Sequence, residues 1–437
     1  MVRGSVAFAR VRGVAPARGG AGVAAALVAL AGLAGCRFDD TGSSCLDWPP
    51  PPLGGISVAP PIGPAGSGFT FEFDPAARAD AYEACTAEAP YADWSCTNVA
   101  GPPVTFALPY PGRYEFRVRP VLGGCGDADW ATSVPVTAQM IWNESPAGLH
   151  WSPRVNHESA VFNGGLWVLG GFTDTGISDE IWSSSDGTTW AWVAAGPHWS
   201  GRGASEALVY DDRLWILGGL TWNGEDDDVW SSPDGVSWTN EGAAGHWSPR
   251  SGHAAAVLDG KMWVTGGSYS ATGNYLDSVY YADVWSSVDG QGWVEVNAAP
   301  PWPARTQHTL TAFEGQLWLL GGRRFDTDTF FDDAWVSADG AAWTEATVPD
   351  RFPARSGHSA VVWDGRLWVM AGAITPSVEY DDLWYTLDGS EWLPVDAAGL
   401  HWSGRKFHTS AVFDDRLWLM GGWNQFTGRN DDVWSGP

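Results

Sequence analysis

A unit of about 50 residues recurs six times between residue 138 and the end of the chain, and this repeat restricts the possible folds more than any other feature. Each copy opens on an arginine, and in all copies but the second a histidine follows three residues later. The arginines are Arg154, Arg202, Arg250, Arg305, Arg355 and Arg405, and the histidines are His157, His253, His308, His358 and His408, with Ser205 in the second copy. Six similar units in a row predict one structural module per copy.

Within each copy, the pattern predicts four β-strands separated by turns. A short apolar segment leads into a two-residue turn such as Asp259-Gly260. A nearly continuous apolar segment such as Leu166–Gly171 follows, which suits a strand buried on both faces. The third strand carries a tryptophan, and an Asp-Gly turn precedes a fourth strand with another. These turns begin at Asp186, Asp234, Asp289, Asp339 and Asp388. We expect type I′ geometry there, because Asp-Gly suits a turn in which both central residues need positive φ.

Four antiparallel strands in each of six units predict an all-β fold, a six-bladed β-propeller over residues 138–437. The last copy stops at Asp431–Pro437, where its fourth strand should begin. The segment Gln139–Trp151 matches the corresponding region of the fifth copy, Ser390–Trp402. We therefore expect residues 139–144 to form an N-terminal strand that closes the last blade, which removes the unpaired edges of a linear array.

The chain contains 30 tryptophans, and the repeat accounts for most of them. Four columns of the repeat supply 23, and Phe352 stands at the one exception. Large aromatic rings bury roughly 150–250 Å² each. We interpret these tryptophans as packing between blades and not as a platform for stacking sugars.

The combination of histidine, Gly-Gly, Asp-Asp and tryptophan resembles kelch repeats, and the resemblance covers residues 138–437. The Ser-x-x-Asp-Gly-x-x-Trp turns also look like the Asp boxes of sialidase-type propellers, with one residue fewer between Asp and Trp. Ser205 in place of histidine, and Ala371-Gly372 in place of the Gly doublet, depart from the kelch pattern. The resemblance implies the propeller fold.

The repeated polar residues are interpreted as structural. Five histidines could form a metal ring, but a residue that recurs around a propeller usually orders the backbone at the start of its strand. The six arginines are matched by six acidic residues, which predicts an internal ion pair or an Asp-capped turn in each blade: Glu180, Asp228, Asp283, Asp333, Asp382 and Asp432. Calcium at Asp226–Asp228 does not fit a recognised loop spacing. We predict no metal and no cofactor.

Residues 1–35 are predicted to be a signal peptide. A basic start and an apolar segment end in Leu33-Ala34-Gly35-Cys36, which resembles a bacterial lipobox; an ordinary signal peptide containing a cysteine is the alternative. The resemblance implies lipidation of Cys36, and acyl chains on it would anchor the protein stably. Residues 36–54 are proline-rich and predict a semi-rigid linker. Because Arg37 follows the cysteine, the same resemblance implies the outer membrane, periplasmic or surface-exposed.

Residues 55–137 predict a small β-sandwich. Phe69–Phe73 and Gly112–Arg119 alternate apolar and polar residues. The segment resembles immunoglobulin-like or fibronectin-III-like modules, which implies a spacer with an internal disulfide. After Cys36 four cysteines remain, an even number that suits an oxidising compartment. Three pairings are possible, and we favour Cys85 with Cys96 and Cys45 with Cys125, because 85 and 96 flank one short hairpin-like segment.

The net charge of −27 is spread along the chain and repels nucleic acid and anionic lipid headgroups. We therefore expect no nucleic-acid partner and membrane contact through the lipid anchor only. The variable loops between second and third strands lie on one face and differ between copies, and such loops commonly carry function. Aromatic and arginine residues there are the predicted anchors for a protein or glycan: Trp222, Tyr269, Tyr275, Tyr280, Tyr281, Arg323, Arg324, Phe325, Phe330, Trp423, Phe426 and Arg429.

No catalytic signature stands out, so we predict a membrane-anchored binding protein. The chain lacks the cysteine after residue 125 that a kelch-type oxidase crosslink needs, and most of its arginines belong to the repeat instead of a sialidase triad. The alternative is a periplasmic kelch-type sugar epimerase or a glycan-processing hydrolase. It would require a pocket of converging Arg, Glu and Tyr outside the repeated positions.

Overall fold

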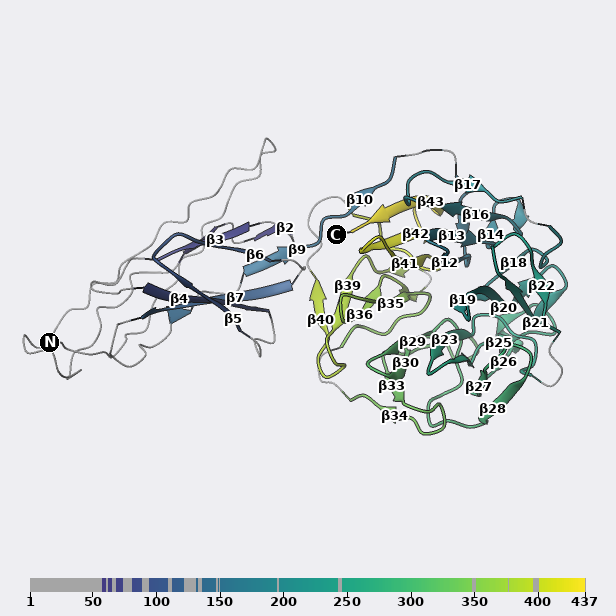
Figure 1. Ribbon diagram of the computed structural model, residues 1–437. Coiled ribbons are helices and arrows are strands. Elements are labelled where there is room, and N and C mark those ends of the chain that lie inside the picture. The colour runs from purple at the N-terminus through teal and green to yellow at the C-terminus, as the bar shows by residue number, and fades with distance from the viewer. Residues whose placement is uncertain are drawn as a thin grey trace, which may run out of the picture. The chain divides into compact units, whose positions relative to one another are not determined.

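The computed structural model describes residues 57–436 except 60–61, 65–67, 74–80, 89–93, 109–111, 122–130, 133–135, 147, 149, 195, 243–245, 348–350, 376 and 396–400. The described residues divide into two compact units, with the boundary between Ile141 and Trp142 (Figure 1). Strands dominate both, and the one helical element within the described residues is the 3₁₀ turn η1 (Tyr275–Asp277). None of the described segments forms a helix with the length and apolar character needed to cross a bilayer.

The first unit is a sandwich of two sheets. One sheet has the order β1 (Ser57–Ala59), β3 (Gly68–Glu72), β6 (Val104–Ala107). The other has the order β2 (Ile62–Pro64), β9 (Val136–Gln139), β7 (Gly112–Val121), β4 (Ala81–Glu88), β5 (Ser95–Val99), with β8 (Ala131–Thr132) also paired to β7. Phe69 and Phe71 of one sheet share a core with Tyr82 and Phe116 of the other. The alternating pattern therefore buries one face of each sheet, as expected for a β-sandwich.

The predicted disulfide between Cys85 and Cys96 is present. The two residues stand directly opposite each other on β4 and β5, with their Cα atoms 4.0 Å apart. The bond therefore joins two neighbouring strands of one sheet. Cys36, Cys45 and Cys125 lie outside the described residues, as do the predicted signal peptide and linker.

The described residues of the second unit form six groups of four antiparallel strands, which we number as blades 1 to 6. The sheet of blade 2 also contains β18 (Arg202–Gly203), and the sheet of blade 6 also contains β11 (Arg154–Val155), β14 (Phe172–Thr173) and β15 (Gly176–Ile177). Blade 1 is β12 (Glu158–Phe162), β13 (Gly165–Leu169), β16 (Ile181–Ser184), β17 (Ala191–Trp192); blade 2 is β19 (Glu206–Tyr210), β20 (Arg213–Thr221), β21 (Gly224–Ser232), β22 (Thr239–Asn240); blade 3 is β23 (Ala254–Leu258), β24 (Lys261–Thr265), β27 (Val284–Ser287), β28 (Trp293–Asn297). Blade 4 is β29 (Thr309–Phe313), β30 (Gln316–Leu320), β33 (Ala334–Ser337), β34 (Thr344–Glu345); blade 5 is β35 (Ser359–Trp363), β36 (Arg366–Met370), β39 (Leu383–Thr386), β40 (Leu393–Val395); blade 6 is β41 (Thr409–Phe413), β42 (Arg416–Asn424), β43 (Gly428–Ser435), β10 (Asn143–Glu144). Figure 1 shows the first strand of every blade nearest the centre of the ring.

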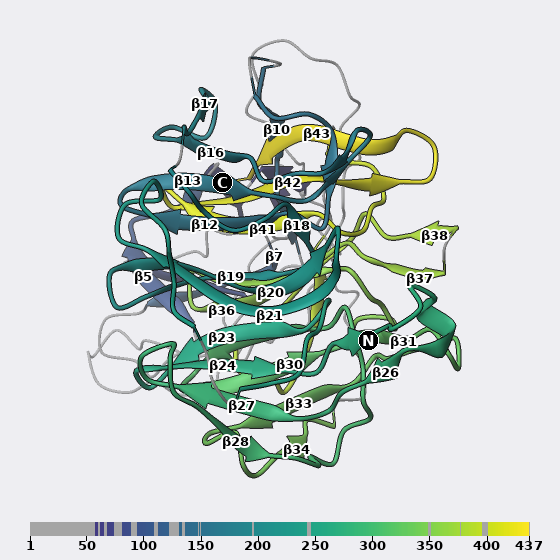
Figure 2. The ribbon, with the colours of Figure 1, turned by 90° about the vertical axis from the view of Figure 1, so that its right-hand side faces the viewer.

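Short hairpins extend from the junctions between second and third strands, and we call the side of the ring that carries them the loop face. They are β14 (Phe172–Thr173) with β15 (Gly176–Ile177), β25 (Ser268–Tyr269) with β26 (Val279–Tyr280), β31 (Arg323–Arg324) with β32 (Thr329–Phe330), and β37 (Ala373–Thr375) with β38 (Val378–Glu379). In blades 2 and 6 the long strands β20–β21 and β42–β43 run directly into the corresponding turns. In Figure 2 the labels β26, β31, β37 and β38 mark this side of the ring, at the right.

The predicted closure of the last blade is confirmed. Asn143 pairs with Ser435 and Glu144 with Trp434, so the start of the unit supplies the fourth strand of blade 6. The strand is shorter than the expected 139–144, because Val136–Gln139 pairs with β7 and β2 in the first unit. Trp142 meets Trp402 edge to face with ring centroids 4.2 Å apart, the contact that a fourth-strand tryptophan makes in the other blades.

A closed ring of backbone hydrogen bonds runs around the axis. In each blade the residue two positions after the arginine has φ between 49° and 61° and donates its N–H to the carbonyl of its counterpart in the preceding blade, at 2.8–3.1 Å. The six residues are Asn156, Ala204, Gly252, Gln307, Gly357 and Phe407, and the N–H of Asn156 donates to Phe407 to complete the circuit. Left-handed backbone is costly for residues other than glycine. The hydrogen bonds of the closed ring must therefore offset this cost at the four positions that are not glycine.

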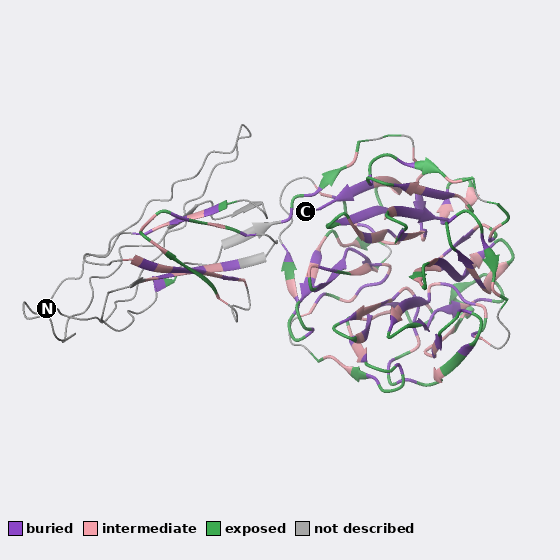
Figure 3. Ribbon diagram, viewed as in Figure 1, coloured by how far each residue is buried: buried purple, intermediate pink, exposed green. Residues whose placement is uncertain are grey.

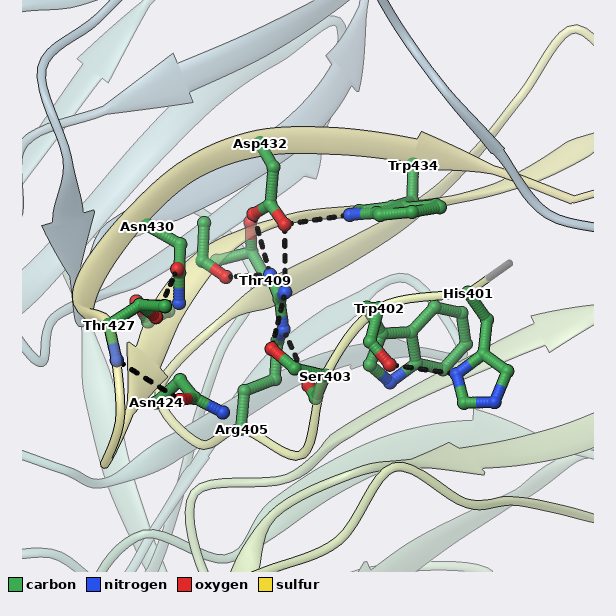
Figure 4. A network of polar contacts seen from close by, with 12 residues as sticks. His401, Trp402, Ser403, Arg405, Thr409, Asn424, Thr427, Asn430, Asp432 and Trp434 are labelled. Atoms are coloured by element: carbon green, nitrogen blue, oxygen red, sulfur yellow. Dashed lines mark hydrogen bonds and ion pairs between the residues drawn. The ribbon is translucent and has the colours of Figure 1, made fainter. Parts of the chain in front are cut away.

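The predicted ion pair between the repeated arginine and acidic residue is present in every blade. In blade 6 Arg405 donates to both oxygens of Asp432 at 2.6 and 2.8 Å, to the Gly421 carbonyl and to the Ser403 carbonyl (Figure 4). Asp432 also accepts the indole N–H of Trp434. The arginines are at most 1% exposed, so their charge is satisfied inside the protein.

The repeated tryptophans pack between and within blades, as predicted. The second-strand tryptophan of one blade lies on the Asp-box glycine of the next: a Cβ on Gly235 would stand 2.3 Å from Trp167, and one on Gly340 would stand 2.1 Å from Trp263. Within each of the six blades, the fourth-strand tryptophan meets edge to face the aromatic residue three positions before that blade's own arginine, as Trp190 meets Trp151, and Phe352 takes that place against Trp392. In Figure 3 the second strands are largely buried, whereas β17 and β34 expose residues.

The predicted type I′ turns are at a different place from the one expected. Between first and second strands both central residues have positive φ, as at Asp259 (50°) and Gly260 (66°). In the Asp-Gly turns before the fourth strand only the glycine does, so the expectation was wrong there. Instead the carboxylate of Asp234 accepts the N–H groups of Val236 and Ser237, at 2.8 and 2.6 Å. Those backbone donors lower the pKa of Asp234.

Ala371 replaces the first glycine of a doublet, and the structure explains why only the second must be kept. The first position has φ near 50–62°, which is 52° at Ala371, whereas the second has φ of 94–107°. A Cβ on Gly372 would lie 2.8 Å from the Cβ of His358. A Cβ at the first position of another blade would also be close to its neighbours, as on Gly321 at 2.9 Å from the Arg355 carbonyl oxygen, so the larger φ is what distinguishes the second position.

Gly372→Ala should lower the free energy of unfolding by at least about 2 kcal/mol, because the new methyl group meets His358 and the backbone is strained. Ala371→Gly is the neighbouring control and should change it by less than about 1 kcal/mol. Urea unfolding followed by tryptophan fluorescence measures both. Equal losses in the two variants would contradict this account of the doublet.

Trp142→Ala should destabilise the propeller by about 3–5 kcal/mol, since it empties a buried site in the strand that closes the ring. The matched control is Trp192→Ala, because Trp192 is 61% exposed on the fourth strand of blade 1. The control should change stability by less than about 1 kcal/mol. Thermal unfolding of both variants decides the point, and an undisturbed Trp142→Ala protein would show that closure does not depend on this residue.

Candidate functional site

The loop face brings together most of the aromatic and arginine residues predicted from the sequence, in two groups. The first group joins the hairpins of blades 3 and 4. The rings of Tyr275 and Phe325 stack with centroids 5.2 Å apart. The hydroxyl of Tyr280 donates to the Tyr275 carbonyl at 2.9 Å and accepts the N–H of Phe325 at 3.1 Å. These contacts hold two neighbouring hairpins in a fixed relation.

Two predicted anchors, Arg323 and Arg324, are already engaged within their own hairpin. Arg323 is 9% exposed, lies 3.9 and 4.2 Å from the ring centroids of Phe325 and Phe330, and pairs with Asp328. Arg324 pairs with Asp326 at 2.5 Å. Because both arginines are bound to partners in their own hairpin, we interpret them as residues that stabilise the hairpin. The apolar contact area for a partner would come from the neighbouring aromatic rings.

Tyr281 does not belong with the non-repeated residues, contrary to the sequence-based interpretation. It stands two residues before the acidic column and lies over the guanidinium of Arg250 at 4.2 Å. Phe331 does the same for Arg305 at 4.0 Å, and Tyr380 for Arg355 at 4.6 Å. An aromatic lid on the buried arginine therefore recurs in three successive blades.

The second group lies on the hairpins of blades 6, 1 and 2. Arg429 pairs with Asp174 of the blade 1 hairpin at 2.7 Å and lies 5.8 Å from the ring of Trp423. Trp222 of blade 2 covers Gly176 of blade 1, where an added Cβ would stand 2.7 Å from its ring. Phe426 is 85% exposed at the tip of its turn. The Arg429–Asp174 pair and the contact of Trp222 with Gly176 each cross from one blade to the next.

A groove of about 420 Å³ separates the loop-face hairpins of blades 2 and 3. Trp222, Tyr269 and Tyr275 line it, together with Glu225 and Pro249. Three of the predicted residues therefore line one groove, with Trp222 on the blade 2 side and Tyr269 and Tyr275 on the blade 3 side. This groove is the place on the loop face where a partner's side chain or a sugar ring has room to enter.

A second cavity, of about 260 Å³, lies on the axis and is lined by residues from all six blades. Its lining includes the ring of backbone hydrogen bonds and the first residues of the innermost strands. Because Glu158 pairs with Leu169, immediately before the blade 1 hairpin, this end of the axis is on the side of the loop face. The cavity walls are mostly polar, with hydroxyl and imidazole groups at repeated positions.

Most of the column histidines link one blade to the next inside this cavity. Their Nε2 atoms lie 2.9–3.2 Å from hydroxyl groups of the preceding blade: His157 with Thr409, His308 with Thr265, His358 with Thr309, and His408 with Ser359. Burial lowers the pKa of His408 to about 3, so the ring is neutral. The structural reading of the column is thus confirmed, with a partner in the neighbouring blade in place of the expected backbone cap.

Two carboxylates in the cavity, those of Glu158 and Glu206, were missed from the sequence. They occupy the position after the column histidine, where the other blades have Ala254, Thr309, Ser359 and Thr409. The sequence signal that could have revealed them is a glutamate in two copies at a repeat position that holds a small residue in the other four copies. Both side chains keep some exposed area because they line a cavity, yet protein surrounds them. This burial raises the pKa of Glu206 to about 8 and, with the neighbouring Glu206, raises that of Glu158.

Comparisons with known proteins agree with this architecture. The KLHDC2/KLHL20/DRC7 Kelch-repeats domain matches the sequence over residues 121–322 and again over 225–422, which together span more than half of the chain. Among solved structures, one titled "Structure of YjhT" matches with a TM-score of 0.51 and 16% sequence identity, covering 67% of this chain and 95% of that one. At that identity the likeness shows the fold alone. The search of curated proteins found no match.

The family match covers residues 121–422. It agrees with the recurrence in the blades of the buried arginine, the histidine, the glycine doublet and the tryptophans. The chain belongs to the kelch-repeat family.

Proposed function

We propose that this protein is an interaction protein that binds a partner protein through the loop face. The observation that carries the proposal is the set of large apolar side chains exposed at the tips of its hairpins. They are Trp222 (71% exposed), Tyr275 (43%), Leu276 (64%), Val279 (55%), Val378 (47%) and Phe426 (85%). Gathered exposed apolar residues on a soluble surface commonly mark a protein interface.

The scaffold beneath these residues supports binding with little loss of conformational freedom. The hairpins are tied to one another by the Tyr275–Phe325 stack and by the Arg429–Asp174 pair. A preorganised surface loses less entropy on association, which favours affinity. Kelch propellers generally mediate protein interactions, and membership of that family therefore supports a protein partner.

A glycan is the second form that the partner could take. The groove between blades 2 and 3 combines aromatic rings of Trp222 and Tyr275 with the carboxylate of Glu225. Aromatic faces with a few polar groups suit a sugar ring as well as a peptide side chain. A glycan array run with the same protein would separate the two ligand classes.

The alternative function is a sugar epimerase or a glycan-processing hydrolase, and its requirement is a unique pocket of converging Arg, Glu and Tyr. The central cavity holds the unique pair Glu158 and Glu206. The lining residues described for that cavity include no arginine and no tyrosine. The exposed apolar surface favours binding over this alternative.

We also propose that the protein is held in the bacterial cell envelope by lipidation of Cys36. Support comes from the Leu33-Ala34-Gly35-Cys36 sequence and from the disulfide between Cys85 and Cys96, since structural disulfides persist in oxidising compartments. The first unit would then act as a spacer between membrane and propeller. Its strand order, with β1, β3 and β6 facing β9, β7, β4 and β5, is consistent with a fibronectin-III-like module.

The triple variant Trp222→Ala, Tyr275→Ala, Phe426→Ala should weaken partner capture at least 10-fold, because it removes exposed apolar anchors from the loop face. The matched control is Trp192→Ala with Val294→Ala, which removes exposed apolar residues from fourth strands. Pull-down from envelope extracts with quantitative mass spectrometry identifies the partner, and titration of the purified partner gives the affinities. Unchanged affinity in the triple variant would exclude the loop face.

Cys36→Ser should release the protein from membranes and abolish incorporation of labelled fatty acid, because the thiol that carries the lipid is lost. Fractionation of cells into membrane and soluble pools measures the first effect, and metabolic labelling measures the second. Cys45→Ser serves as the control and should keep both lipid and membrane association. Persistent labelling of the Cys36→Ser protein would rule out this anchor.

A further inference from the structure

The central cavity departs from six-fold regularity most strongly between blades 1, 2 and 3; at the next boundary Ala254 has no hydroxyl, and His308 contacts Thr265 instead. In blades 4, 5 and 6 the residue after the column histidine is Thr309, Ser359 or Thr409, and its hydroxyl binds the histidine of the next blade. In blades 1 and 2 that residue is Glu158 or Glu206. The side chain that should face Glu158 from blade 2 is Ser205, since this blade lacks the histidine. The regular hydroxyl–imidazole contact is therefore replaced by two carboxylates.

His253 is the third group at this place, and it is left without a partner. It is 2% exposed and lines the cavity. By position its Nε2 should face Glu206, yet neither ring nitrogen has a hydrogen-bond partner among the described residues. Burial lowers the pKa of His253, and the backbone of Leu217 opposes this with a smaller effect, although no hydrogen bond to the ring is formed. The ring is neutral, so one of its nitrogens is free to accept.

The side chains in this part of the cavity share one chemical character. The carboxylates of Glu158 and Glu206, which also accept the backbone N–H groups of Ala207 and Ala255, are acceptors, as is one nitrogen of the neutral imidazole. The buried side-chain carbonyl of Gln307 on the cavity wall is an acceptor without a partner among the described residues. When both carboxyl groups are ionised, this set of side chains offers no hydrogen-bond donor and carries negative charge. A protein whose net charge is −27 adds a field of the same sign.

We propose that the central cavity binds an aliphatic primary ammonium group, held by Glu158, Glu206 and His253. An ammonium group offers three donors and one positive charge, which matches two carboxylates and one imidazole nitrogen. The cavity of about 260 Å³ leaves room for the attached carbon chain. Burial raises the pKa of both carboxyl groups in the empty cavity, and a bound cation would offset that cost.

The spacing of these groups disfavours a bare metal ion held by all three. Among the described residues, the only His, Cys, Asp or Glu groups whose ligand atoms all lie within 4.8 Å of one another are Glu83, Cys85 and Cys96, and both cysteines are in the disulfide. The ligand atoms of Glu158, Glu206 and His253 are thus too far apart for all three to bind one metal ion. Acceptors around an ammonium nitrogen stand up to about 5.8 Å apart, twice a normal hydrogen-bond length.

The test is isothermal titration calorimetry of the full chain with n-butylammonium, with tetramethylammonium as the ligand control that has charge but no N–H donors. We expect one site per chain for n-butylammonium and at least 10-fold weaker binding of tetramethylammonium. Glu158→Gln with Glu206→Gln should weaken n-butylammonium binding at least 10-fold. The charge-matched control, Glu295→Gln with Glu391→Gln, alters exposed residues and should leave binding unchanged.

A second variant tests the site without removing either carboxylate. Ser205→His restores the missing column histidine, whose ring should bind Glu158 and compete with the ligand, so that affinity falls at least 10-fold. Circular dichroism and thermal unfolding establish that each variant is folded. A lysine-containing peptide compared with n-butylammonium distinguishes a partner's lysine from a free amine, and tighter binding of either identifies the source.

Several results would overturn the proposal. These are no binding of n-butylammonium in the millimolar range, equal binding by the variant that lacks both carboxylates, or calcium binding that depends on the two glutamates in the absence of amine binding. The proposal goes beyond the loop-face function and fails separately from it. The triple variant of Trp222, Tyr275 and Phe426 should keep full affinity for n-butylammonium.

Discussion

The buried arginine of each blade is the interaction on which the rest of the propeller depends. Its guanidinium donates to the carbonyl just after the second strand, to the carboxylate just before the third strand, and to the carbonyl two residues before the arginine itself. In blade 4 these partners of Arg305 are Gly321, Asp333 and Pro303, respectively. Leaving one partner out would strand a buried charge, which is strongly destabilising. The arginine therefore fixes the geometry at the loop-face end of every blade.

Closure of the ring follows from contacts that recur at each blade boundary. The left-handed residues Asn156 to Phe407 form an unbroken circuit of backbone hydrogen bonds, and Asn156 can complete it only if blade 6 lies next to blade 1. Trp142 and β10 join the two ends of the propeller by filling the fourth-strand site of blade 6. Backbone pairing and aromatic packing thus impose the same arrangement, which leaves specificity to the residues that differ between blades.

Those differences fall into two regions with different physics. On the loop face, exposed apolar side chains such as Trp222 and Phe426 stand on hairpins that are braced against one another. In the central cavity, Glu158 and Glu206 introduce carboxyl groups into a wall of hydroxyl, amide, neutral imidazole and apolar groups. The first region suits an extended partner surface and the second a small cationic group, and these are the two kinds of recognition that we propose for one scaffold.

The sequence by itself determined the propeller, the number of its repeats, the closing strand, the Arg–carboxylate pairs and the Cys85–Cys96 bond, because each rests on residue periodicity or local spacing. Tertiary structure decided what periodicity cannot contain. Arg323 is buried between aromatic rings, Tyr281 is a lid on Arg250, and Glu158 with Glu206 meet across blades. Such outcomes depend on which side chains from distant copies converge in space, and on how much water remains around them.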